Sequence, residues 1–121
     1  MTIYIIKFDF VPNYSSHTEE ATFLDAVASP IDFTNSRDFE LRIGKVKADR
    51  LGSPSLIMRQ NERDIVIKDP ANAGILQFNF KEEKFKALSS GNWLGNLTRS
   101  VNGVRRAFAE VELVVVSDVG G

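Results

Sequence analysis

The sequence predicts an all-β domain, an antiparallel sandwich of about eight short strands with one short helical connector. The first observation behind this prediction is the alternation of apolar and polar residues in several short runs, which is the period of a strand that buries one face. The second is the spacing of Gly, Pro, Asn and Asp between these runs. Turns at such short intervals favour a sandwich over alternating strands and helices.

The composition is that of one globular domain spanning residues 1–121. Hydrophobic residues make up 43% of the chain and charged residues 26%, which suffices for a core. The 15 basic and 16 acidic residues leave a net charge of -1, so no global field draws the chain to nucleic acid or to an anionic membrane. Cysteine is absent, which excludes disulfides, thiolate nucleophiles and sulfur-ligated zinc. No apolar run approaches the length of a membrane span.

The first strand is expected within residues 1–10. Its core face is predicted by apolar residues at a spacing of two: Tyr4, Ile6, Phe8 and Phe10. Lys7 and Asp9 belong to the opposite face and interrupt the apolar run, so we expect a strand here rather than a secretion signal.

Residues 18–28 allow two interpretations. The sequence Thr18-Glu19-Glu20 resembles a helix start, and Phe23 and Val27 recur at helical spacing. The residues from Thr22 to Leu24 fit a strand as well. The strand is preferred because strands are predicted on both sides, and the helix stays open as an alternative.

The middle of the chain contains the clearest alternation. Phe39, Leu41 and Ile43 alternate with charged residues and predict a half-buried strand. Around it the sequence predicts a turn at 29–35, a polar hairpin or loop at 45–54, and short strands at 55–60 and 64–68.

The C-terminal half continues the pattern. Leu76, Phe78 and Phe80 predict another strand by their spacing of two. Residues 82–88 can form one or two helical turns that direct Phe85 and Leu88 inward.

The last two strands are predicted at 93–100 and 104–116. They flank Asn102-Gly103, a favoured two-residue hairpin turn because both residues tolerate positive φ.

The residue types that catalysis needs are not grouped in a recognisable motif. His17 is the only histidine, so a histidine-rich metal site is excluded, and we expect it to be solvated. No nucleophile motif, phosphate loop or dinucleotide fingerprint occurs. We therefore expect no enzyme, no cofactor and no metal. The acids predicted to cap turns or face solvent, rather than form a catalytic pair, are Asp25, Asp32, Asp38, Asp64 and Asp69.

Two basic clusters are candidate nucleic-acid sites. They are Arg99, Arg105 and Arg106 in the last hairpin and Lys81, Lys84 and Lys86 in the connector. Aromatic residues are not interleaved with them, so we expect solvated basic faces instead.

Several consecutive segments carry a resemblance to a known family. The turn Pro30-Ile31-Asp32-Phe33-Thr34-Asn35 precedes the strand around Leu41. Later, a turn with Asp69-Pro70 and Gly74 leads through an alternating strand and an acidic connector to Gly91-Asn92-Trp93-Leu94-Gly95-Asn96-Leu97. This order resembles the small immunoglobulin-like β-sandwich proteins of tailed bacteriophages and prophages, including the N-terminal modules of baseplate upper proteins. The resemblance covers residues 30–119, and Trp93 stands where the family usually has Tyr. This family position implies that Trp93 is a core residue rather than a surface anchor.

The resemblance implies a non-enzymatic structural component of a phage particle, assembled in the bacterial host cytoplasm and located in the virion. A tail, baseplate or fibre-attachment module is preferred, and a head decoration or head-tail connector protein is the alternative. Expected partners are other virion proteins and further copies of the chain, contacted through edge strands such as residues 1–10 or 111–116. No membrane, nucleic-acid or small-molecule partner is expected.

Two hypotheses come from other classes of protein. A soluble carbohydrate-binding sandwich would need an exposed row of aromatic residues, whereas most of the nine Phe are predicted to face the core. A small hydrolase would need a carboxylate pair in a pocket.

The partner interface is predicted in residues 13–29, which exceed what a sandwich needs to join two strands. Its candidate residues are Tyr14, His17, Phe23 and Leu24, because their aromatic and apolar character is high for an exposed loop.

Overall fold

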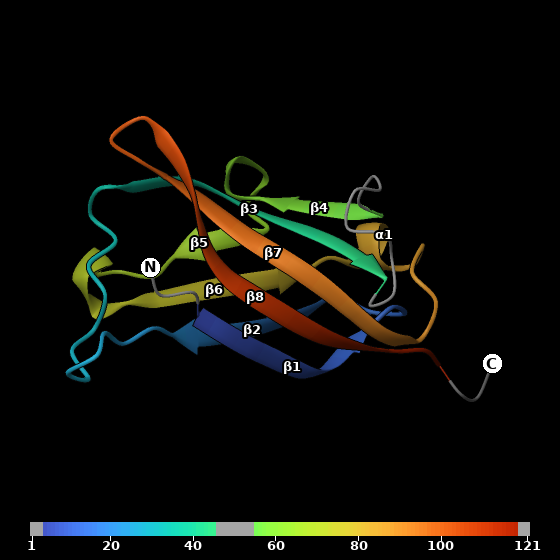
Figure 1. Ribbon diagram of the computed structural model, residues 1–121. Helices are drawn as coiled ribbons and strands as arrows, with labels where there is room; N and C mark the ends of the chain where they lie inside the picture. Colours follow the sequence, from blue (N-terminus) through green and yellow to red (C-terminus); the bar gives the residue numbers. More distant parts are fainter. Residues whose placement is uncertain (1–3, 46–54, 119–121) are drawn as a thin grey trace.

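The computed structural model describes residues 4–45 and 55–118, and within them the chain forms a sandwich of two β-sheets (Figure 1). The strands are β1 (Tyr4–Pro12), β2 (His17–Thr22), β3 (Ser36–Lys45), β4 (Leu56–Arg59), β5 (Ile65–Ile67), β6 (Ile75–Phe80), β7 (Gly91–Val101) and β8 (Val104–Val116). The helical turns are η1 (Gln60–Glu62), η2 (Ala71–Ala73) and α1 (Glu82–Phe85). The predicted all-β sandwich with a short helical connector is confirmed.

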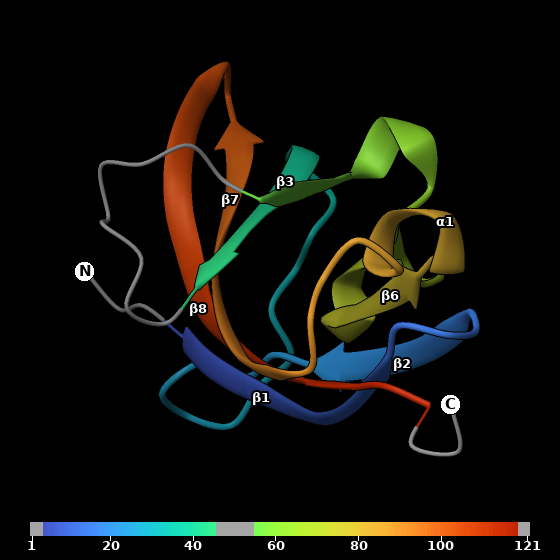
Figure 2. The same cartoon turned by 90° about the vertical axis from the view of Figure 1, so that its right-hand side faces the viewer.

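The two sheets differ in size. The larger has five strands in the order β1-β8-β7-β3-β4, and the smaller has three in the order β2-β6-β5. Figure 2 shows β1, β8, β7 and β3 curving around one side of the core, with β2, β6 and α1 on the other side. β1 and β2 follow each other in the chain but belong to different sheets. Each of them is an edge strand of its sheet.

The prediction that all strands are antiparallel is wrong for one pair. β1 pairs with β8 in parallel, from Tyr4 opposite Ala109 to Pro12 opposite Val116. Alternation in a sequence shows which face of a strand is buried but not the direction of its neighbour. β8 consequently lies between β1 and β7, so residues 111–116 are not the sheet edge that the sequence suggested.

The face of β1 changes near its end. Tyr4, Ile6 and Phe8 pack on the core as predicted. The register with β8 then shifts between Phe8 and Val11, as in a β-bulge, so that Val11 is buried while Phe10 is 43% exposed. The prediction that Phe10 faces the core is therefore wrong, because one extra residue changes the phase of the alternation.

Residues 18–28 are half strand and half irregular. β2 ends at Thr22, and the following turn is held by Asp25, whose Oδ1 accepts hydrogen bonds of 2.9 Å from the N–H groups of Val27 and Ser29. The preferred strand is thus correct for the first part, and no helix forms. Asp25 caps a turn as predicted.

Most other predicted strands and core residues are confirmed. The core also contains an aromatic cluster centred on Phe108, whose ring centroid is 4.9–6.0 Å from those of four neighbours. These neighbours come from β1, β3 and the segment after β2: Tyr4, Phe23, Phe33 and Phe39. The predicted core residues Leu41, Ile43, Leu76, Phe78, Phe80, Phe85, Leu88 and Trp93 are buried. The predicted hairpin or loop at 45–54 lies outside the described residues after Lys45.

The last hairpin forms as predicted. Asn102 and Gly103 have φ values of 52° and 80°, which match a two-residue turn with both residues in the left-handed region. β7 and β8 pair from Val101 opposite Val104 to Gly91 opposite Val115. This long antiparallel pair occupies inner positions of the larger sheet.

Candidate interaction site

The four predicted interface residues do not form one surface. Tyr14 lies in the turn between β1 and β2 and is 43% exposed, whereas Leu24, also 43% exposed, follows the other end of β2. The six residues of β2 separate the two ends by about 20 Å at the usual rise of a strand. Phe23 is 1% exposed and belongs to the core, so its assignment to the interface is wrong.

His17 is held rather than freely solvated. Its ring centroid lies 5.3 Å from that of Phe10 and 6.4 Å from that of Phe80, and its Nε2 is 3.1 Å from Glu19. The side chain is 30% exposed. Phe10, Tyr14 and His17 together place aromatic rings at the end of the sandwich where β1 turns into β2.

The feature that sequence reasoning missed is the exposed apolar content of β1. Ile5 is 68% exposed, and Phe10 joins it as the second exposed apolar residue of this edge strand. Lys7 and Asp9 lie between them, 56% and 82% exposed, with their charged atoms 3.6 Å apart. An ion pair this exposed contributes little to stability. The signal that could have revealed Phe10 is the adjacent pair Phe10-Val11, which breaks the alternation.

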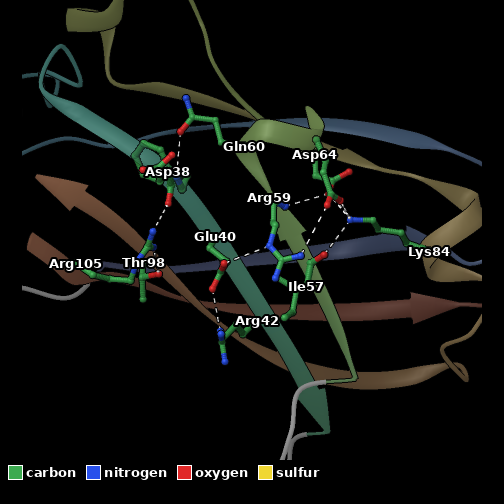
Figure 3. Close-up of polar contacts among 12 residues, drawn as sticks. Asp38, Glu40, Arg42, Ile57, Arg59, Gln60, Asp64, Lys84, Thr98 and Arg105 are labelled. Atoms are coloured by element: carbon green, nitrogen blue, oxygen red, sulfur yellow. Dashed lines mark hydrogen bonds and ion pairs between the residues drawn. The ribbon is translucent and has the colours of Figure 1, made fainter. Parts of the chain in front are cut away.

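A second candidate site is an open pocket of about 210 Å³ where β3, β4, η1 and Arg105 meet. Several of its polar groups are bound within the fold (Figure 3). Arg105 donates to Thr98 Oγ1 at 2.7 Å and to the carbonyl of Asp38 at 3.0 Å, and Gln60 Oε1 accepts the N–H of Phe39 at 3.0 Å.

Two residues with carboxylates line this pocket, Asp38 and Glu40. Glu40 accepts from Arg42 Nε at 2.9 Å and from Arg59 Nε at 3.4 Å. The hydrogen bond from Arg42 lowers the pKa of Glu40 by more than burial raises it, with smaller contributions from Arg59 and Arg105. Glu40 is therefore ionised at neutral pH and is a poor proton donor. Two of the charged side chains that line the pocket, Glu40 on β3 and Arg59 on β4, thus pair with each other across the two strands.

Beside the pocket, a buried acid ties the connector to the sheet. The side chain of Asp64 is 0% exposed, and its Oδ2 accepts the N–H of Arg59 at 3.0 Å and Lys84 Nζ at 2.6 Å (Figure 3). Lys81 Nζ lies 3.1 Å from Oδ1. Lys84 also donates to the carbonyl of Ile57 at 3.0 Å. The sequence prediction of a turn-capping or solvated Asp64 missed this pairing, which joins α1 to the β4–β5 turn.

Part of each basic cluster also makes contacts inside the fold, whereas Lys86 and Arg106 are exposed. Lys81 and Lys84 converge on Asp64, and the guanidinium of Arg99 lies 4.4 Å from the ring centroid of Phe108 while its Nη1 donates to Ser36 Oγ at 2.9 Å. Burial lowers the pKa of Arg99, and the nearby Tyr4 raises it by a smaller amount.

Among residues 4–45 and 55–118, no group of three or more His, Cys, Asp or Glu side chains is placed to hold a metal ion. No helix in this part of the chain has the length and hydropathy to cross a membrane.

Replacing Lys84 by methionine is expected to lower the free energy of unfolding by about 2 kcal/mol, because Asp64 would stay buried with one cation fewer. Urea unfolding at neutral pH measures this loss. Lys86→Met is the matched control, since Lys86 lies two residues further on the connector and is exposed, and it should change stability by less than about 0.5 kcal/mol. Equal effects of the two substitutions would show that the buried contact is not stabilising.

The same acid predicts a pH dependence. Burial on its own raises the pKa of Asp64, but the hydrogen bonds from Lys84, the Arg59 N–H and Lys81 outweigh it and lower the pKa from its ordinary value of 3.8. A lowered pKa in the folded state stabilises the fold above that ordinary value, and this contribution is lost as pH falls through the folded-state pKa. Stability of Asp64→Asn should therefore vary less than that of the wild type between roughly pH 5 and pH 2. Parallel curves would contradict this.

Comparisons with known proteins give little. No protein-family model matches the chain, and no curated protein matches its sequence significantly. Among solved structures the chain is similar to the endo-β-1,4-mannanase from Thermotoga petrophila, with 11% sequence identity and a TM-score of 0.46. The match covers 93% of this chain and 18% of the length of the mannanase chain. A likeness this weak carries no argument about what the chain does.

Proposed function

We propose that the chain is a non-enzymatic interaction module that serves as a structural component of a bacteriophage particle, in the tail, baseplate or fibre attachment. The observation that carries the interaction role is the edge strand β1, which presents Ile5 and Phe10 to solvent beside an exposed ion pair. Exposed apolar residues on a sheet edge are typical of surfaces that other chains cover. The virion assignment rests on the sequence resemblance, with head decoration or head-tail connection as the alternative location.

The arrangement of aromatic rings favours this function over carbohydrate binding. Sugar-binding sandwiches expose a row of aromatic side chains, whereas Trp93 is 4% exposed and eight of the nine Phe are buried here. Phe10 and Tyr14 are exposed, but both lie at one end of the molecule rather than across a sheet face.

The direct test is the composition of purified particles. We expect the protein to be present in them in a copy number set by particle symmetry, and cryo-electron microscopy would place it in the tail or the head. Its absence from purified particles would refute the virion assignment.

A pair of variants tests the surface. Ile5→Glu should reduce incorporation into particles while leaving the thermal melt unchanged, because Ile5 is 68% exposed. Val104→Glu is the control, since Val104 is 50% exposed and lies at the start of β8 beside the hairpin turn, outside the part of β8 that pairs with β1. Equal incorporation of both variants would exclude the β1 edge as the contact.

A further inference from the structure

One side of β1 has no strand partner within the described residues. The strand pairs with β8 along one side only, because it ends the order of the larger sheet (Figure 2). An unpaired edge of nine residues offers backbone N–H and C=O groups for a further strand. The question is which strand fits.

We propose that the occupant is β1 of a second copy of this chain, paired antiparallel about a two-fold axis at Phe8, so that two five-stranded sheets become one continuous sheet. The proposal deepens the proposed function, since it rests on the β1 edge being a contact surface and names the partner. A two-fold contact of this kind uses the same patch on both copies and closes as a dimer.

Charge complementarity selects this register. In an antiparallel pair centred on Phe8, Lys7 lies opposite Asp9 of the second copy, and Asp9 lies opposite its Lys7. Each of these side chains is mostly exposed and on the outward face of the sheet, so both cross-strand pairs can form. Centring the pair on residue 7 would place Lys7 against Lys7, and centring it on residue 9 would place Asp9 against Asp9. Like charges directly opposite each other are unfavourable, so neighbouring registers are disfavoured.

The apolar residues of the edge do not decide the register. The bulge turns Phe10 outward, whereas Ile6 packs at the margin of the core, so Phe10 of one copy and Ile6 of the other lie on different faces of the continued sheet. The ring of Phe10 packs instead on His17 of its own chain, at 5.3 Å between centroids. The register therefore rests on Lys7 and Asp9, which share the outward face.

The first test is self-association of the purified chain, measured by sedimentation equilibrium at low salt. The wild type should form a dimer. Lys7→Glu and Asp9→Lys should each weaken the dimer about ten-fold or more, because each replaces two attractive pairs with two repulsive ones. The double variant Lys7→Glu with Asp9→Lys should restore dimerisation, because Glu at position 7 again faces Lys at position 9. High salt should weaken the wild-type dimer.

A second test reads the register directly. The chain has no cysteine, so Lys7→Cys and Asp9→Cys proteins carry single thiols. Under mild oxidation a mixture of the two should form mainly position 7 to position 9 disulfides, since directly opposite residues lie within bridging distance. Predominant 7–7 or 9–9 disulfides would overturn the proposed register.

The outcomes separate the two proposals. A wild type that is monomeric at millimolar concentration, or a dimer that both charge reversals leave unchanged, would overturn the β1 pairing. In that case Lys7 and the bulge act as protection against edge pairing. Either result leaves the virion assignment untouched, because that assignment is decided by the composition of the particles. At concentrations low enough for the wild type to be monomeric, thermal melts of all variants should match the wild type, as expected for residues that are 56% and 82% exposed.

Discussion

Trp93→Ala is expected to lower the free energy of unfolding by about 3–5 kcal/mol, which is a large share of the stability of a small domain. Trp93 lies on β7, is 4% exposed, and donates its Nε1–H to the carbonyl of Ser89 at 2.9 Å. Lys45 Nζ covers the ring at 4.4 Å from its centroid. Removing the indole leaves a cavity and an unpaired carbonyl, so chemical denaturation should show a markedly earlier midpoint.

Two control substitutions separate packing from surface effects. Trp93→Phe keeps an aromatic ring and should cost about 1–2 kcal/mol, because only part of the volume and the hydrogen bond are lost. Asn92→Ala, at the exposed neighbouring position on β7, should be neutral within about 0.5 kcal/mol. An unchanged melting temperature of Trp93→Ala together with lost partner binding would show a surface role instead.

Gly74→Ala is expected to cost about 3 kcal/mol or more. Gly74 has φ +72°, which penalises a side chain by about 1–2 kcal/mol. A Cβ there would also lie 2.7 Å from the carbonyl oxygen of Phe23 and 2.9 Å from the N of Ile31. These backbone atoms cannot give way easily, because Ile31 N–H donates to the Phe23 carbonyl at 2.9 Å and Phe23 N–H donates to the Gly74 carbonyl at 2.7 Å. Forced overpacking adds about 1–3 kcal/mol.

Gly103 supplies the matched control. Its φ is +80°, but nothing lies within 4 Å of the Cβ that alanine would add. Gly103→Ala should therefore cost only the conformational penalty of about 1–2 kcal/mol. Equal losses in urea unfolding for the two variants would show that the segment from Phe23 to Ile31 yields to the added methyl group.

The strands could be predicted because each shows its buried face locally. Phe39, Leu41 and Ile43 on β3 are 0–1% exposed, as their spacing of two requires. The connector followed the same logic at helical spacing, with Phe85 and Leu88 buried. In both cases the decision lies in neighbouring residues of one short segment.

The candidate site was predicted poorly, because exposure depends on what covers a residue. Phe23 and Leu24 are adjacent and similar in hydropathy, yet Phe23 is buried beneath Phe33 and Phe108 while Leu24 faces solvent. Phe10 was assigned to the core by a rule that holds only for an unbroken strand, and the bulge in β1 breaks it.

The sequence by itself determined the all-β class, the residues of most strands and the Asn102-Gly103 turn, because periodicity and turn chemistry act within a few residues. Only the tertiary structure decided that β1 runs parallel to β8, that β1 rather than β8 is an edge, and that Asp64 is buried with two lysines. These features join segments that are distant in the chain. Their outcome depends on which strand neighbours which, and alternation within a single strand does not encode that choice.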